Sequence, residues 1–295
     1  MDQSEQERLR QEVDEVLHGA RAGQEPQGPE KFEQNAYSHV RHVVGVCSGK
    51  GGVGKSLVCG ILAVELARRG ARVGVLDADI TGPSIPKMLG LSGQRARGVD
   101  DLIVPNRTEG GIEVMSANLV LEHETDPVIW RGPVVAGAIK QFWEDCAWGE
   151  LDYLLVDMPP GTGDVPLTVF QSLPVEGIVI VSSPQDLVQM VVGKAVNMAG
   201  MMNVPVLGLV ENMSYVACPH CGEKIYPYGP SRLSETAAAL DVEALGQLPI
   251  DPALAAACDA GTFERDLPEG LIPDAVEAVV RTAEFYDALR GGEGA

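Results

Sequence analysis

The sequence has no long apolar stretch and, for its size, few aromatic and few basic residues. None of its hydrophobic runs approaches the ~20 residues that a membrane-spanning helix needs. The first residues, MDQSEQERLRQEVDEV, are charged and lack the apolar segment of a secretory signal. We therefore expect a cytoplasmic protein with no membrane partner.

Positive charge is scarce, because 22 Lys and Arg residues stand against 42 Asp and Glu residues, a formal net charge of −20. Nucleic acids and anionic lipids bind clusters of Lys and Arg, so such a surface would repel both. The composition thus argues against a nucleic-acid partner. Since 45% of the 295 residues are hydrophobic, the chain can bury the core of a sizeable α/β domain.

The six cysteines do not predict a disulfide framework, since the expected compartment is reducing. Four of them stand apart in the sequence and are typical of small buried hydrophobic residues: Cys47, Cys59, Cys146 and Cys258. Cys218 and Cys221 differ, because they form a C-x-x-C pair with proline and histidine between them.

The clearest motif is GKGGVGKS at residues 49–56, which matches the phosphate-binding loop G-x-x-x-x-G-K-[ST]. Its glycines let backbone amides approach a phosphate chain closely, and those amides form a nest for anionic oxygens. Lys55 can reach the outer phosphates, and the Ser56 hydroxyl can ligate Mg²⁺. The predicted nucleotide-binding residues of the loop are Gly49, Lys50, Gly51, Gly52, Val53, Gly54, Lys55 and Ser56. An ordinary loop of this kind does not need Lys50.

The surroundings of the motif support it, since a chance match in a glycine-rich turn would lack them. Residues 42–47 (HVVGVC) predict a buried strand, residues 55–69 a helix ending at Gly70, and residues 71–77 a second strand. This β–loop–α–β order brings phosphates to the amino end of a helix.

The rest of the chain continues to alternate strands and helices. Further strands are predicted at residues 112–117, 151–157, 177–182, 206–211 and 244–249, and further helices at 133–143, 187–202 and 272–289. The pattern predicts an α/β fold with a mostly parallel twisted sheet and helices on both faces. We divide the chain into an acidic, mobile arm at residues 1–37, whose first part can form a helix, and a P-loop ATPase domain with the C-x-x-C loop at residues 38–295.

Aspartates follow two of the predicted strands. Ligands of parallel sheets bind at the carboxyl ends of strands, where Asp77, Asp79 and Asp157 all fall. Asp157 stands where an aspartate of a P-loop enzyme holds Mg²⁺ through water. Either Asp77 or Asp79 could orient the attacking water, and the other would then serve only in a turn.

The C-x-x-C pair allows several interpretations. Two thiolates at this spacing can share a soft metal, but zinc and iron–sulfur clusters usually take four ligands, and the sequence has no second C-x-x-C. The missing pair would come from a second copy across a two-fold axis. A redox dithiol, a zinc knuckle that uses His220 and two inert cysteines are the alternatives. The flanking residues, YVACPHCGEKIYPYG, predict a loop rather than the helix that a redox dithiol opens.

Seven motifs in order resemble the Mrp/ApbC family of P-loop ATPases, which carry iron–sulfur clusters and belong to the deviant Walker A class. They are CSGKGGVGKS, DADITGPSIPKMLG, WRGP, DYLLVDMPPGTGD, SSPQDL, ENMSYVACPHCG and LPIDP, and they run through most of residues 38–289. Residues 1–37 are too short for the extra domain of many members, and without cysteine they lack the amino-terminal cluster motif of some eukaryotic relatives.

The resemblance implies a role for several residues. Lys50 would be the signature lysine that reaches the partner's phosphates across a homodimer, and Asp79 and Asp157 would be the switch aspartates. Asn212 would read adenine. Cys218 and Cys221 would bridge a labile [4Fe–4S] cluster between two subunits.

The implied ligands are ATP, Mg²⁺ and the cluster, and the implied partners are a cluster-assembly scaffold and apo iron–sulfur proteins. Two competing functions remain at this stage. One is a MinD/ParA-type positioning ATPase, and the other is a zinc-stapled dimeric ATPase with another client.

Overall fold

A computed structural model describes residues 32–79, 82–120, 132–161, 163–185 and 189–292. Residues 32–295 form one compact unit by their internal contacts. The predicted arm overlaps this unit, because Phe32 accepts a hydrogen bond from the Trp143 indole and Asn35 donates to the carbonyl of Glu144. Residues 32–37 therefore pack on the domain, while residues 1–31 lie outside the described part.

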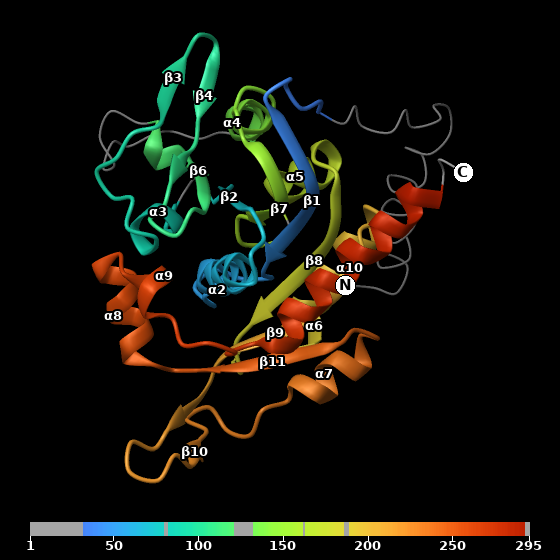
Figure 1. Ribbon diagram of the computed structural model, residues 1–295. Coiled ribbons are helices and arrows are strands. Elements are labelled where there is room, and N and C mark those ends of the chain that lie inside the picture. The colour runs from blue at the N-terminus through green and yellow to red at the C-terminus, as the bar shows by residue number, and fades with distance from the viewer. Residues whose placement is uncertain (1–31, 80–81, 121–131, 162, 186–188, 293–295) are drawn as a thin grey trace, which may run out of the picture. The chain divides into compact units, whose positions relative to one another are not determined.

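The unit is built on a nine-stranded sheet in the order β10-β9-β8-β1-β7-β2-β6-β5, with β11 paired to β9 (Figure 1). All strand pairs are parallel except β5 with β6 and β10 with β9. The strands are β1 (Ser38–Cys47), β2 (Val73–Asp77), β5 (Asn106–Arg107), β6 (Glu113–Ser116), β7 (Gly149–Asp157), β8 (Val175–Ser182), β9 (Val206–Ala217), β10 (Lys224–Ile225) and β11 (Ala244–Pro249). A separate hairpin joins β3 (Arg97–Val99) to β4 (Leu102–Val104).

Helices cover both faces of the sheet, and each face has its own apolar core. One core packs under α2 (Lys55–Arg68), α3 (Ile85–Met88), α8 (Pro252–Ala260), α9 (Phe263–Asp266) and α10 (Pro273–Gly292). The other packs under α4 (Gly132–Glu144), α5 (Asp164–Ser172), α6 (Gln189–Met201) and α7 (Leu233–Ala239). A short 3-10 turn, η1 (Ala117–Leu119), follows β6. No helix in the described ranges is long and apolar enough to cross a membrane.

The predicted α/β fold is confirmed, and the strands and helices predicted within residues 38–295 are present, most with ends that shift by a few residues. The helix predicted at the start of the arm lies outside the described residues. The prediction of a loop around the C-x-x-C pair is wrong at its edges. Strand β9 continues past Glu211 to Ala217, and β10 pairs with its end through Lys224 and Ile225. The predicted strand ended where polar Asn212 interrupts the apolar run. In the structure Tyr215 pairs with β11, and Val216 and Ala217 pair with β10.

Candidate functional site

The P-loop connects the carboxyl end of β1 to the first turn of α2, as its motif requires. Gly52 and Gly54 have φ angles of 80° and 83°, in the left-handed region that glycine enters without strain. Gly54 is also crowded, since a Cβ there would lie 2.0 Å from the side-chain nitrogen of Asn212. The loop therefore depends on glycine at this position both for its backbone angle and for its close contact with β9.

We expect Gly54→Ala to weaken nucleotide binding by at least about tenfold, because left-handed strain of roughly 1–2 kcal/mol adds to the clash with Asn212. Titration with a fluorescent nucleotide measures the effect. Gly70→Ala is the matched control, since Gly70 has φ 90° but nothing within 4 Å of an added Cβ. Equal loss of binding in both variants would show that general destabilisation, and not the loop, is responsible.

A buried charge cluster lies at the loop. Lys55 Nζ donates to Asp157 Oδ1 at 2.6 Å and lies 3.6 Å from Asp79 Oδ2, while Ser56 Oγ donates to Asp157 Oδ2 at 2.5 Å. Asp157 is fully buried at the end of β7. The structure thus brings together the four residues that the sequence assigned to phosphate and magnesium chemistry.

The cluster places three carboxyl groups and one ammonium group in buried or partly buried positions. Burial would lower the pKa of Lys55, but the neighbouring carboxylates, Asp157 foremost, raise it above its ordinary value. Burial raises the pKa of Asp157, against the opposing effect of its bonds from Lys55 and Ser56. Burial and the charge of Asp157 raise the pKa of Asp77 to about 8. A cation bound beside Asp157 would oppose these effects and lower the pKa of both carboxyl groups.

The donor set fits Mg²⁺. Hard oxygen donors are what this ion prefers, and in phosphate sites it usually takes one or two protein ligands together with water and substrate oxygens. Ser56 and Asp157 supply such oxygens next to the loop. Within the described ranges, no group of three or more His, Cys, Asp or Glu side chains is placed to hold a metal alone. Ser56 and Asp157 would accordingly share the ion with a bound nucleotide.

Asp77 and Asp79 have different surroundings. Asp77 is fully buried, and its carboxyl group bonds the Ser116 hydroxyl and the backbone amides of Asp79 and Ile85. Asp79 is partly exposed and lines the pocket at the loop. Of the two, only Asp79 has the access that a water-orienting residue needs.

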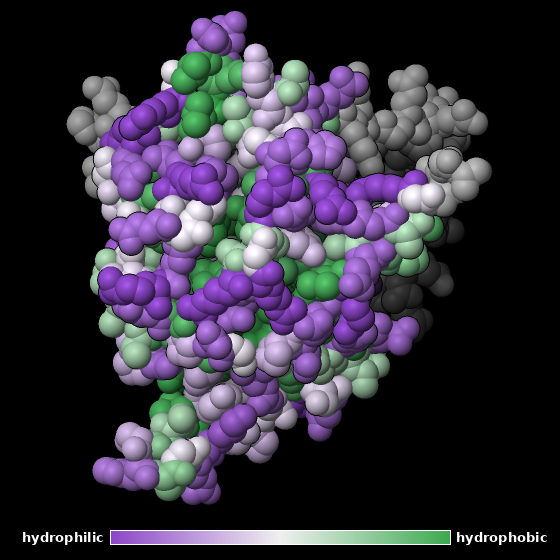
Figure 2. Space-filling view, viewed as in Figure 1, coloured by the Kyte–Doolittle hydropathy of each residue, from purple (hydrophilic) through white to green (hydrophobic). Residues whose placement is uncertain are grey.

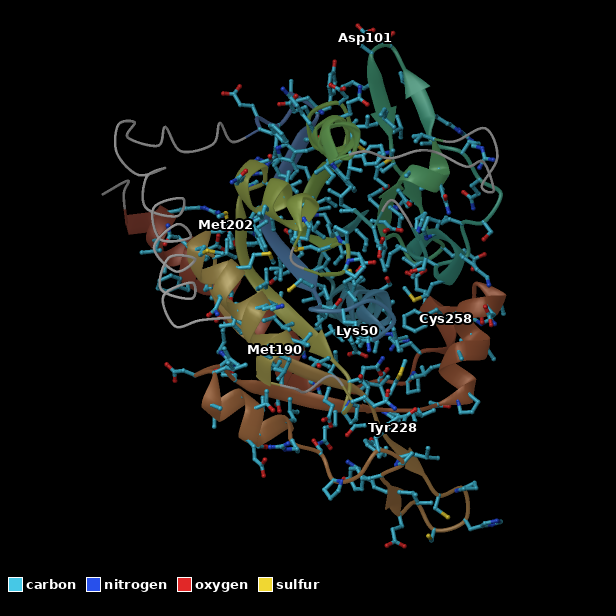
Figure 3. The ribbon with its side chains drawn as sticks, turned by 180° about the vertical axis from the view of Figure 1, so that it is seen from behind. Lys50, Asp101, Met190, Met202, Tyr228 and Cys258 are labelled. Atoms are coloured by element: carbon cyan, nitrogen blue, oxygen red, sulfur yellow. The ribbon has the colours of Figure 1, made fainter. Side chains whose placement is uncertain are left out.

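The pocket over the P-loop has a volume of about 500 Å³, within the range of small-molecule sites. Besides the loop and Asp79, it is lined by Lys87 and Met88 from α3, Pro160 after β7, Met213 from β9 and Cys258 from α8. Figure 3 labels Cys258 on α8 and Lys50 near α2. Met213 and Cys258 carry no signal in the sequence that would have placed them here.

Asn212 has a structural role that sequence reasoning missed. Its Nδ2 donates to the carbonyl of Val53 at 2.9 Å, and its Oδ1 accepts from the amide of Met213 at 2.9 Å. The side chain is 1% exposed. Asn212 thus ties the P-loop to β9, and its reading of adenine stays a prediction.

Cys218 and Cys221 lie in the turn of the hairpin that β9 and β10 form, which projects from the sheet (Figure 1). The turn is closed by bonds from the Cys218 amide to the Glu223 carbonyl and from the Gly222 amide to the Cys218 carbonyl. Cys221 is exposed and Cys218 half-buried. Hydrogen bonds from the backbone of His220 and Cys221 lower the pKa of Cys218, which favours the thiolate that binds metals.

The hairpin also carries exposed apolar surface. Ile225, Tyr226 and Tyr228 are 54%, 37% and 47% exposed. Figure 2 shows hydrophobic and hydrophilic residues side by side at the lower left, where the hairpin projects. Lys50 is likewise exposed, at the P-loop.

The comparison with protein families decides the class of this chain. A family model described as ParA, NUBPL iron-transfer P-loop NTPase, matches residues 39–283. The chain belongs to this family. An iron–sulfur cluster carrier protein of Clostridium perfringens is 50% identical over 248 residues, which are 82% of this chain and 87% of the relative.

Solved structures agree with the family. A nucleotide-binding protein from Archaeoglobus fulgidus, in complex with ADP, is 45% identical with a TM-score of 0.71 over 78% of this chain and 90% of that chain. The cell division ATPase MinD of Pyrococcus furiosus is 22% identical with a TM-score of 0.56 over 84% of this chain and 99% of that chain, and shows only the shared fold.

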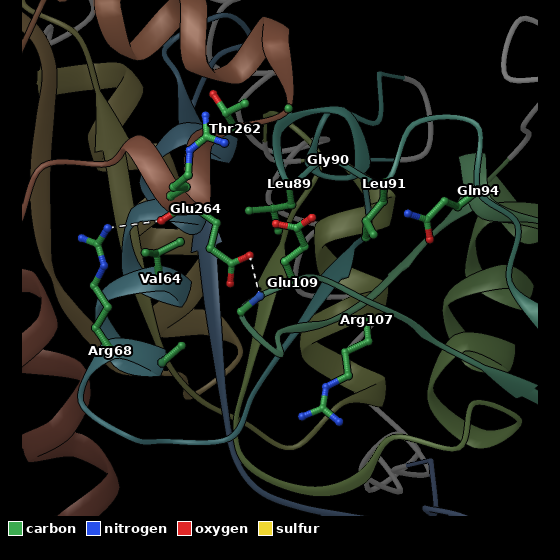
Figure 4. Close-up of a pocket in the computed structure, with 14 residues that line it drawn as sticks. Val64, Arg68, Leu89, Gly90, Leu91, Gln94, Arg107, Glu109, Thr262 and Glu264 are labelled. Atoms are coloured by element: carbon green, nitrogen blue, oxygen red, sulfur yellow. Dashed lines mark hydrogen bonds between the residues drawn. The ribbon is translucent and has the colours of Figure 1, made fainter.

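This NUBPL-type NTPase has a second hollow, of about 610 Å³, on the α2 face (Figure 4). Two of its arginines already have partners within the protein. Arg68 donates to the carbonyls of Glu264 and Leu267, and Arg107 Nε lies 3.5 Å from Glu113 Oε1. Glu264 in turn accepts from the Gly110 amide. The P-loop glycines and Lys55 line the smaller pocket instead.

Proposed function

We propose that the protein binds and hydrolyses ATP with Mg²⁺ and carries a labile [4Fe–4S] cluster, which it passes to apo iron–sulfur proteins. The observation that carries the proposal is the pair of accessible thiols in the β9–β10 turn, on the same strand that contacts the P-loop. The name of the Clostridium perfringens relative and the ADP in the Archaeoglobus fulgidus structure support the two halves of the proposal.

We further propose a homodimer, because of the number of ligands that a cluster needs. A [4Fe–4S] cluster takes about four thiolates. In the described part of the chain, Cys47, Cys59 and Cys146 are buried and Cys258 lies at the nucleotide pocket, so the exposed turn offers two. Two copies related by a two-fold axis would complete the set. A cluster held only at the interface between two subunits becomes accessible to an acceptor protein when that interface opens.

The nucleotide chemistry rests on the charge cluster. Lys55 and the loop amides would bind the β- and γ-phosphates, and Ser56 and Asp157 would hold Mg²⁺ there. We assign Asp79 to the orientation of the attacking water, because it is the accessible member of the aspartate pair.

We expect Lys50→Ala to lower the rate of ATP hydrolysis by about tenfold or more while nucleotide affinity changes less, because a lysine that acts across the dimer stabilises charge that develops during transfer. Steady-state hydrolysis and equilibrium binding measure the two effects. Lys140→Ala, another exposed lysine on the far element α4, is the control. Equal losses of rate and affinity would assign Lys50 to ground-state binding.

The proposal is tested by anaerobic reconstitution with iron and sulfide, followed by incubation with an apo-protein that has an empty [4Fe–4S] site. The proposal is supported if the acceptor gains activity while the carrier loses its visible absorbance. Comparison of the transfer rate with and without ATP measures the contribution of the nucleotide. A protein that takes up stoichiometric zinc but no iron would instead be the zinc-stapled dimer.

Two expectations stay predictions. The cluster-assembly scaffold as donor rests on the family resemblance alone, and the cytoplasmic location rests on the sequence. The cysteine hairpin does not support the alternative of a MinD/ParA-type positioning ATPase, because such a protein would not need a pair of exposed thiols.

A further inference from the structure

Strand β9 is irregular where it passes the nucleotide pocket. In its ladder with β11, Gln247 pairs with Glu211 and Pro249 with Tyr215, so residues 212–214 of β9 face the single residue 248. Such a bulge bends a strand and re-aims the side chains that follow it. The bulge begins at Asn212, which contacts the P-loop, and it precedes the turn that holds Cys218.

The backbone of the bulge is in an uncommon conformation. Four non-glycine residues in the described ranges have positive φ, and three of them are Asp100, Asn203 and Asp241, of the residue types that tolerate it. The fourth is Met213, with φ 57°. An unbranched apolar side chain gains nothing from this region, so the surrounding structure must hold Met213 there.

The contacts that hold Met213 come from the nucleotide site. Its amide donates to Asn212 Oδ1, whose Nδ2 donates to the carbonyl of Val53 in the P-loop. Met213 itself lines the nucleotide pocket. A nucleotide in this pocket would therefore meet both the residue and the loop that restrains it.

The same segment is closed by a side-chain contact. Ser214 Oγ donates to Glu211 Oε2 at 2.5 Å, and both residues are fully buried. This bond joins the residues on either side of Asn212 and Met213, so the positive φ of Met213 lies within a segment that its own side chains connect.

We propose that Met213 is a positioning residue that couples nucleotide occupancy to the setting of the cysteine turn. Its side chain contacts the bound nucleoside phosphate, and the bulge then relaxes toward a regular strand. Because β9 is continuous from the bulge to Ala217, and Cys218 follows directly, the turn shifts with it. The inference rests on the proposed function, since it connects the nucleotide pocket to the cysteines that would bind the cluster.

The test uses the reduced full-length protein without a cluster. Alkylation of each cysteine by iodoacetamide is followed by peptide-resolved mass spectrometry, with and without saturating Mg²⁺ and a non-hydrolysable ATP analogue. Cys258 lines the pocket and reports occupancy directly, while Cys218 and Cys221 report the turn. We expect the nucleotide to change the rates at Cys218 and Cys221 about fivefold or more in the unmodified protein.

Variants separate coupling from binding. We call the alkylation rate at Cys218 and Cys221 with nucleotide, compared with the rate without it, the rate ratio. Met213→Gly and Met213→Ala remove the side chain from the pocket and should reduce this ratio to below about twofold at saturating nucleotide. Met213→Leu keeps an apolar side chain and should preserve the ratio. Asn203→Gly, at a left-handed residue before β9, is the matched control and should leave the ratio unchanged.

Three outcomes would overturn the inference. Retention of the full ratio by both Met213→Gly and Met213→Ala, with Cys258 still protected, would exclude Met213 as the link. Protection of Cys258 in the unmodified protein without any change at Cys218 and Cys221 would exclude the coupling and leave the proposed function standing. Failure of the unmodified protein to bind the nucleotide at all would remove the proposed function as well.

Discussion

Cys218→Ala is expected to abolish cluster binding while nucleotide affinity stays unchanged. With one thiol left per chain, a two-fold dimer offers about two ligands where a [4Fe–4S] cluster takes about four. The loss should be complete rather than partial, because two thiolates leave half of the cluster's ligand positions empty. Iron content and visible absorbance after anaerobic reconstitution measure the loss, and nucleotide titration checks the P-loop.

Cys258→Ala is the matched control for this substitution, because Cys258 is also a half-buried cysteine but lies at the nucleotide pocket. It should retain the full iron content. A Cys218→Ala protein that still reconstitutes a whole cluster would show that the ligands lie elsewhere.

Lys55→Ala should have the opposite pattern, with nucleotide binding weakened by about 10- to 100-fold and cluster loading retained. A charge-assisted hydrogen bond contributes roughly 1.5–3 kcal/mol, and every 1.4 kcal/mol is a factor of ten. The buried carboxyl group of Asp157 also loses its cationic partner, which stands at 2.6 Å. Equilibrium titration with ADP measures the affinity.

Lys55→Met is a useful second variant, because it fills the volume of the lysine stem in a site that is 6% exposed. If thermal unfolding shows that both variants fold, the lost affinity belongs to the ammonium group. Unchanged affinity in both would contradict the assignment of the P-loop pocket as the nucleotide site.

Sequence patterns predicted that Lys55, Ser56 and Asp157 lie together, since this depends on local rules, and their roles stay predictions. A glycine-rich turn between a strand and a helix fixes where Lys55 and Ser56 point, and parallel strands bring Asp157 to the same edge of the sheet. The matching family model confirms the class of fold that these motifs indicated.

The course of β9 could not be predicted, because it depends on contacts between residues far apart in the sequence. Asn212 contacts Val53 across 159 positions, and the bulge appears only through the pairing of β9 with β11. The hairpin around Cys218 needs β10, which has just two residues and gives no periodic signal. Long-range pairing therefore decided the part of the molecule that joins the two proposed sites.

Strand β9 connects the two proposed sites, and this connection would explain why one protein binds both ATP and an iron–sulfur cluster. Asn212 and Cys218 are six positions apart on a continuous strand and turn, at most about 20 Å at the usual rise per residue. The P-loop contact is at one end of this stretch and the cysteine turn at the other.

The central claim is that one cluster is bridged by two copies of the chain through Cys218 and Cys221. Native mass spectrometry of the anaerobically reconstituted protein tests it most directly, because it reads subunit number and iron content in the same ion. The account predicts a dimer with one [4Fe–4S] cluster, or about two irons per chain. A monomer that carries a complete cluster, or a dimer that carries zinc and no iron, would contradict it.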